Sequence, residues 1–190
     1  SLWHASVVPA GGYQFTRDVS IAVNVPFHVA EEAKLKWGHA LPEAVEEHEE
    51  VLLPPMQGGT KRPVLRRELC YPLRERAAEL LKLVVQRVHQ AGLDYMPPGG
   101  LVLTGGAAAL PGLEELARRL VPGPVRVGVP RNFPGLPQEV RRPAYATSVG
   151  ILLWGIKHHG EGRGYHDGER TLWGYLAPFR RRRSRVATPA

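Results

Sequence analysis

The sequence predicts an α/β fold that contains a parallel sheet. The main observation is a unit of strand, helix and strand, formed by Leu101 to Leu103, Pro111 to Leu120 and Val125 to Val127. Two short apolar strands joined by such a helix usually lie parallel in one sheet. The glycine-rich stretch from Thr104 to Ala109, between the first strand and the helix, supports this assignment.

The amino-terminal part shows the same order of elements. Leu2 to Val8 is predicted as a strand, and a glycine turn follows it. A helix is expected from about Thr16, whose hydroxyl can cap the first turn. A second helix is predicted from Phe27 to Trp37, with Gly38 as its left-handed cap.

The middle of the chain changes character. An acidic, proline-bearing stretch surrounds one short exposed strand, Val51 to Leu53, which is expected to begin a separate small lobe. The longest predicted helix runs from Glu68 to Ala91, with apolar residues every three or four positions, and Gly92 ends it. Pro72 lies in its first or second turn and is expected to bend the helix or delay its start.

The last predicted element of the folded body is a helix from Pro143 to Lys157. Residues 158–170 are glycine-rich and polar, which is typical of a flexible linker. Residues 171–190 then form a separate basic tail, because five arginines near the end carry most of the net charge of +7.

Composition limits the class of protein. With 43% hydrophobic and 23% charged residues, the chain is expected to fold. Cys70 is the only cysteine and cannot form an internal disulfide, which favours the cytosol. No apolar run approaches the roughly 20 residues of a spanning helix. Because Ser1 directly precedes a predicted strand, with no earlier element to pair with it, the chain is interpreted as a fragment.

Several enzyme motifs are missing from the sequence. The turn from Thr104 to Ala109 lacks the Gly-Lys-Ser/Thr of a P-loop and the third glycine of a dinucleotide fingerprint. His158 and His159 are adjacent, with no cysteine or acid at metal-ligand spacing. No serine lies in a nucleophile elbow. We therefore predict no catalytic residue and no metal site.

Two glycine turns and one charged pair are the candidate binding residues. Gly11-Gly12 and Gly105-Gly106 each follow a predicted strand and precede a helix, where backbone amides can approach a nucleotide. Glu31 and Lys34 lie about one turn apart on one helix face. Taken singly, the glycine turns also fit tight turns without a ligand, and the charged pair is more often a solvated ion pair.

Longer segments carry a resemblance to a known family. In order and spacing, the chain resembles the FtsA family of actin-like cell division proteins over roughly residues 1–157, on the segments VPAGGYQFTRDVSIAV, AEEAKLKWGHAL, GGLVLTGGAAALPGLEELARRL, PVRVGVPRNFPGL and PAYATSVGILLWG. The resemblance implies the carboxyl-terminal half of such a protein. Its fold would be the second large lobe of the actin/Hsp70-like, ribonuclease H-like architecture, formed by residues 1–40 and 98–157. A small α+β subdomain is inserted at residues 41–97.

The resemblance also implies a nucleotide site. Gly11-Gly12 would approach the phosphates or ribose, Glu31 and Lys34 the ribose and adenine side, and Gly105-Gly106 the adenosine. ATP with Mg²⁺ is the implied cofactor of the full-length protein. The first phosphate loop and the first large lobe have no counterpart in this sequence. No enzymatic activity is therefore expected of the chain, and at most a weak ATPase of the full-length protein.

Basic residues gather before and within the start of the long helix, at Lys61, Arg62, Arg66, Arg67 and Arg74. A concentrated positive face suits an acidic peptide, and a solvated basic face has the same composition. By resemblance, the small subdomain binds the acidic carboxyl-terminal peptide of FtsZ, the tubulin-like ring protein. Arg66 and Arg67 are the preferred contacts, with Arg74 as a third.

The tail resembles the amphipathic membrane anchor that ends FtsA-like proteins. Pro178 departs from that pattern because it discourages helix at Ala177. A disordered basic tail that contacts nucleic acid is the alternative, and the preferred interpretation includes no nucleic acid. The residues expected to contact anionic lipids are Leu172, Trp173, Leu176, Phe179, Arg180 and Arg181.

Together these features imply an adaptor of the division machinery. It would link the FtsZ ring to the cytoplasmic side of the bacterial plasma membrane at the septum, and it would self-associate into actin-like filaments. The alternatives are a type IV pilus assembly protein with the same body and a chaperone-type or sugar-kinase-type ATPase. The cationic, aromatic tail argues against the first, and the second needs a catalytic carboxylate from the lobe that this sequence lacks.

Overall fold

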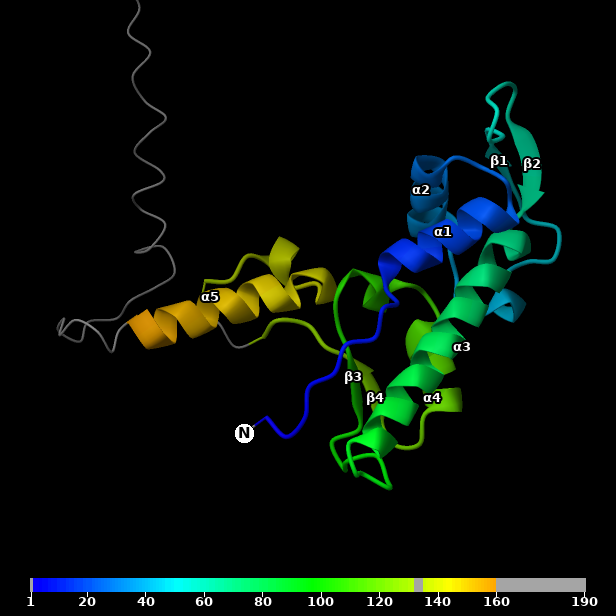
Figure 1. Ribbon diagram of the computed structural model, residues 1–190. Coiled ribbons are helices and arrows are strands. Elements are labelled where there is room, and N and C mark those ends of the chain that lie inside the picture. The colour runs from blue at the N-terminus through cyan, green and yellow to red at the C-terminus, as the bar shows by residue number, and fades with distance from the viewer. Residues whose placement is uncertain (1, 132–134, 160–190) are drawn as a thin grey trace, which may run out of the picture. The chain divides into compact units, whose positions relative to one another are not determined.

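The computed structural model describes residues 2–131 and 135–159 and shows a mixed α/β chain (Figure 1). The chain divides into two compact units, residues 1–128 and 129–190. The first contains helices α1 to α4 and two small sheets, and the second contains α5. Within the described ranges, no helix combines the length and apolar character needed to cross a membrane.

Helices α1 (Gly12–Ala22) and α2 (Phe27–Trp37) pack against each other. The predicted bounds of α2 are confirmed at both ends. α1 begins four residues before the predicted start, so Thr16 lies inside the helix rather than at its cap. Its hydroxyl oxygen lies 3.0 Å from the Gly12 carbonyl oxygen, in the first turn of the helix. Gly12, the second glycine of the predicted turn, is therefore the first residue of the helix, and Gly11 is its N-cap.

The strand predicted from Leu2 to Val8 is wrong. These residues form no strand, and Leu2, Trp3 and Val7 are 82 to 84% exposed. A strand needs a hydrogen-bonded neighbour, and none of the described strands pairs with this segment. Apolar composition alone did not identify a strand here.

Gly38 follows α2 but is not the left-handed cap that was predicted. Its φ of −64° and ψ of 143° are open to other residues. The reason for glycine is space, because a Cβ would lie 2.3 Å from the Lys34 carbonyl oxygen, 2.9 Å from Leu73 Cδ1 and 3.2 Å from Leu110 Cδ1. The end of α2 is thus packed tightly against two other parts of the unit.

The acidic middle segment forms an antiparallel pair, β1 (Glu50–Leu53) and β2 (Arg62–Leu65). The predicted strand at residues 51–53 is confirmed, but its predicted exposure is wrong for two of three residues. Val51 and Leu53 are buried, whereas Leu52 points outward and is 60% exposed. Alternation along a strand produces this pattern. The sequence analysis did not predict β2.

Helix α3 (Arg66–Gln90) follows β2 without a loop. It begins two residues before the predicted start and continues through Pro72, so the proline does not delay it. Gly92, with φ at +79°, follows the helix end as predicted. Figure 1 shows α3 extending from the β1–β2 pair to the end of the unit where α4 packs against it. The residues that α3 buries are Leu69, Cys70, Leu73, Ala77 and Leu81.

The predicted parallel unit is confirmed. β3 (Leu101–Leu103) pairs in parallel with β4 (Val125–Val127), and Leu101 lies opposite Val125. The connection contains a short 3₁₀ helix, η2 (Gly106–Ala109), and then α4 (Leu113–Leu120). α4 begins two residues after the predicted start because Gly112, with φ at +78°, makes a left-handed turn directly before it.

The second unit contains two short 3₁₀ turns, η3 (Gln138–Val140) and η4 (Pro143–Tyr145), followed by α5 (Ala146–His159). The helix predicted from residue 143 thus starts as a 3₁₀ turn. It continues over His158, which had been assigned to the linker, where the imidazole stacks on Trp154 with ring centroids 4.5 Å apart. The remainder of the predicted linker and the whole tail lie outside the described residues.

The core of the first unit includes residues from all three segments that were assigned to subdomains. Helix α3 packs on α1 and on α4, so the long helix joins the two ends of this unit. The predicted boundaries near residues 40 and 97 remain predictions. The largest fully buried side chains are Phe15, Thr16, Val19, Val25, Leu41, Leu69, Cys70 and Leu73.

Replacing Gly38 by alanine is expected to destabilise the fold. The new methyl group would overlap the Lys34 carbonyl and Leu73, and such overpacking costs about 1 to 3 kcal/mol. Urea unfolding of Gly38→Ala measures the loss. Gly99→Ala is the matched control, since a Cβ there would meet nothing within 4 Å. Equal stability of the two variants would contradict this packing.

Candidate functional site

A cavity of about 480 Å³ lies where the first turn of α1, the exposed side of α2 and the segment after β3 meet. This volume falls within the range of about 300 to 1,000 Å³ that is usual for small-molecule sites. All three contributing segments belong to the first compact unit. The cavity is lined by Gly12, Tyr13, Phe15, Phe27, Glu31, Lys34, Leu35, Gly106, Ala107, Ala109, Leu110 and Pro111.

A polar cluster around Lys34 joins α2 to α1 at this cavity. The Lys34 Nζ lies 2.7 Å from Glu31 Oε2, 2.8 Å from Thr16 Oγ1 and 3.3 Å from the Gly12 carbonyl oxygen. The Lys34 side chain is only 12% exposed. Three partners match the three donors of an ammonium group, so its position is fixed.

Glu31 is the more open member of this pair, with its side chain 39% exposed. Partial burial raises the pKa of Glu31, but the hydrogen bonds from Lys34 and Thr16, together with the positive charge of Lys34, outweigh it and lower the pKa overall. The carboxylate is therefore ionised at neutral pH. Both contacts engage Oε2, so Oε1 keeps its capacity to accept hydrogen bonds from a ligand.

The structure gives different reasons for glycine at the positions predicted to bind a nucleotide. Gly105 has φ at +90°, a conformation that L-residues avoid, so the backbone requires it. A Cβ on Gly106 would meet nothing within 4 Å, so its missing side chain only leaves room at the cavity wall. A Cβ on Gly12 would lie 3.9 Å from Lys34 Nζ. The Gly11 amide is already engaged, because it donates to Gln14 Oε1 at 2.9 Å.

The structure brings four of the six predicted nucleotide residues together. Gly12, Glu31, Lys34 and Gly106 line one cavity although up to 94 positions separate them in the chain. Gly11 and Gly105 precede two of these residues but do not line the cavity themselves. The convergence is a geometric fact, and the role of these residues in binding remains a prediction.

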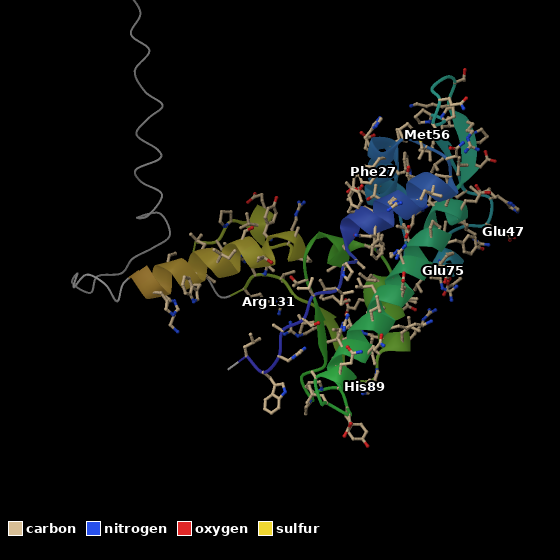
Figure 2. All side chains as sticks on the ribbon, viewed as in Figure 1. Phe27, Glu47, Met56, Glu75, His89 and Arg131 are labelled. Carbon is tan, nitrogen blue, oxygen red and sulfur yellow. The ribbon has the colours of Figure 1, made fainter. Side chains whose placement is uncertain are left out.

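Sequence reasoning did not identify the apolar lining. Tyr13 and Phe27 pack with ring centroids 5.0 Å apart, and Figure 2 shows Phe27 at the surface of the unit rather than in its core. Leu35 is 74% exposed. A helical spacing could have indicated two of them, because Phe27 and Leu35 lie four residues before and after Glu31, on the same helix face.

The basic residues proposed for peptide contacts are already partly engaged within the protein. Arg66 Nη1 lies 2.8 and 3.0 Å from the two Glu49 carboxylate oxygens, and Arg66 Nε donates to the Trp37 carbonyl at 2.8 Å. Arg67 Nε donates to the Val45 carbonyl at 3.0 Å. Both arginines therefore fix loops against the start of α3.

Arg74 is more open than Arg66, with its side chain 43% exposed compared with 24%. It lies 4.0 Å from Glu43, which also pairs with Arg119 at 2.6 Å. A hydrogen bond from its own backbone amide and the contact with Arg119 lower the pKa of Glu43. The predicted membrane-anchor residues, at positions 172, 173, 176 and 179–181, lie outside the described residues.

Solved structures with a similar fold come from the actin-like MreB group. MreB5 of Spiroplasma citri bound to ADP superposes with a TM-score of 0.56 at 15% identity, covering 82% of this chain and 48% of that one. The same protein bound to AMPPNP gives 0.54 at 16% identity, with 81% and 46% covered. These likenesses show a partial actin-like fold, in agreement with the predicted fold class.

Sequence comparison gives the family. The model of "Cell division protein FtsA" matches residues 1–150. FtsA of Pseudomonas aeruginosa is 35% identical over 159 residues, which cover 84% of this chain and 38% of that protein. FtsA of Escherichia coli K12 is 35% identical over 166 residues, with 84% and 40% covered. The chain thus spans about two fifths of the length of these relatives, and it belongs to the FtsA family of actin-like cell division proteins.

Proposed function

We propose that this chain is the nucleotide-binding, carboxyl-terminal part of an adaptor that links the FtsZ ring to the cytoplasmic side of the bacterial plasma membrane at the septum. The observation that carries the proposal is the convergence of Gly12, Glu31, Lys34 and Gly106 on one cavity. Membership of the FtsA family supports a role in cell division. Because the family match covers residues 1–150, the pilus-assembly and chaperone-type alternatives are not retained.

The cavity has the chemistry that a nucleoside phosphate needs. The first amides of α1 have no partner inside the helix, and a helix amino terminus attracts phosphate. The ionised Glu31 can accept hydrogen bonds from sugar hydroxyls, and the apolar wall can cover a base. The related fold of MreB5 binds ADP and AMPPNP in its solved structures. We propose ATP with Mg²⁺ as the ligand of the full-length protein.

This chain would contribute binding rather than catalysis. The polar lining consists of one ionised acid, whose partner is a fixed ammonium group, and one tyrosine hydroxyl. These groups can orient a sugar. None of them is positioned as a general base that could activate a water molecule. We therefore propose that the chain supplies no catalytic residue and that the full-length protein is a weak ATPase at most.

We propose that the acidic carboxyl-terminal peptide of FtsZ docks on the basic start of α3. Arg66 supports this surface indirectly, because its guanidinium holds Glu49 and Trp37. Arg74 is well placed for direct contact, since its side chain is 43% exposed and that of Arg66 only 24%. Arg67 keeps its two terminal nitrogens for a partner while Nε binds Val45.

Gly106→Val in the full-length protein is expected to weaken ATP binding at least tenfold. The branched side chain would project from the cavity wall into space that is now open. Calorimetric titration with ATP·Mg²⁺ measures the affinity. Gly99→Val is the control, because that site also has open space around it but does not line the cavity. If both variants bound ATP like the parent, the cavity would not be the nucleotide site.

Arg74→Ala is expected to weaken binding of the FtsZ carboxyl-terminal peptide several-fold, because one exposed positive charge is lost. Fluorescence anisotropy with a labelled peptide measures the affinity. Arg87→Ala is the matched control, since Arg87 is also on α3 but lies near its other end, where its guanidinium donates a hydrogen bond to Gln90. Equal losses in the two variants would indicate a nonspecific charge effect. Arg66→Ala is unsuitable, because losing its internal hydrogen bonds costs about 1 to 3 kcal/mol of stability.

Deleting residues 171–190 is expected to abolish binding of the full-length protein to anionic vesicles. The deleted segment carries the aromatic residues and arginines that favour a charged membrane interface. Cosedimentation with vesicles that contain phosphatidylglycerol measures binding, and neutral phosphatidylcholine vesicles are the control. If the shortened protein pelleted with anionic vesicles to the same extent as the parent, residues 171–190 would not be a membrane anchor.

A further inference from the structure

We infer that the cavity recognises a purine ribonucleotide through its sugar and phosphates, and hardly distinguishes adenine from guanine. The inference rests on the proposed nucleotide function and specifies which ligands the site takes. It depends on how polar and apolar groups are distributed over the lining residues.

Three of the side chains that line the cavity are polar, those of Tyr13, Glu31 and Lys34. Lys34 is fully occupied by its three partners, so Glu31 is the one charged group with a carboxylate oxygen left for a ligand. The ring of Tyr13, which carries the second polar group, packs on Phe27. Phe27 lies one helical turn before Glu31 on α2. The sugar and phosphates are therefore expected between Glu31 and the start of α1.

The other side chains of the lining are apolar. Leu35 lies one turn after Glu31, and the segment from Ala107 to Pro111 contributes alanine, leucine and proline. None of these side chains can donate to or accept from the edge of a base. A flat purine fits between such surfaces through apolar contact.

Several backbone groups of the same segment are engaged in the fold. The Ala108 amide donates to the Gly105 carbonyl, and the Leu110 amide donates to the Ala107 carbonyl. The Pro111 carbonyl accepts from the Ala40 amide at 2.7 Å, and proline has no amide proton to donate. These bonds remove groups that could otherwise read the base edge.

Sites that hydrogen-bond a polar group reject a ligand lacking it by about 10⁴ to 10⁵, whereas apolar pockets discriminate by only about 10 to 200-fold. Adenine and guanine differ in the polar groups on one edge and present nearly equal faces. We therefore expect ATP and GTP to bind within about tenfold of each other. CTP should bind more weakly because its single ring buries less apolar surface.

The first test is competition against a fluorescent ATP analogue bound to the full-length protein, with ATP, GTP, CTP and 2′-deoxy-ATP as competitors. Similar displacement by ATP and GTP, with weaker displacement by the other two, supports the inference. A preference for ATP above about 200-fold, beyond the range that apolar pockets give, overturns it while leaving nucleotide binding intact. Absence of binding by every nucleotide overturns the proposed function as well.

The second test introduces a base-reading group. Leu35→Gln places an amide on the apolar wall, so the ratio of ATP to GTP affinity is expected to change at least threefold, on the order of one added hydrogen bond. Leu52→Gln is the control, because Leu52 is also an exposed leucine but lies on β1, away from the cavity. An unchanged ratio in Leu35→Gln, with ATP binding retained, would show that the base does not contact this wall.

Discussion

The candidate site depends on the ammonium group of Lys34. It is largely buried and reaches the carboxylate on its own helix, a hydroxyl on α1 and the first carbonyl of α1. A buried charge is costly unless every donor is satisfied, so these partners are held at fixed positions. The same contacts fix the angle between α1 and α2 at the cavity, and they set the ionisation of Glu31. Structure and binding chemistry thus share one set of hydrogen bonds.

A second set of polar contacts holds the other side of the unit together. Arg76 pairs with Asp18 through two nitrogens, at 2.6 and 3.1 Å, and thereby joins α3 to α1. Arg66 joins the start of α3 to the end of α2. α1 therefore has Thr16 at the cavity and Asp18 at α3, two residues apart. The proposed nucleotide and peptide surfaces lie on elements that pack directly against each other.

Sequence reasoning succeeded where local pattern decides structure. α2, α3 and the parallel β3–β4 pair follow from apolar periodicity and from glycine positions. It was wrong at Leu2–Val8, because pairing depends on a partner strand that an apolar segment does not reveal. It was also wrong about the reason for Gly38, whose neighbours Leu73 and Leu110 are remote in sequence. Contacts of this kind are set by tertiary packing and leave no local signal.

The residues of the candidate site also divide into those that local pattern could predict and those that it could not. Its polar members were predictable, because Glu31 and Lys34 share a helix face and each glycine turn opens a helix. Its apolar members were not, since exposed residues such as Leu35 and Tyr13 resemble ordinary surface residues until the cavity is seen. Sequence motifs identify groups that bind a ligand through hydrogen bonds and charge. Selectivity among bases depends instead on whether the cavity lining offers polar groups to the edge of the base. The composition of that lining becomes visible only when remote segments are brought together, and for this reason the selectivity of the site had to be inferred from its three-dimensional lining.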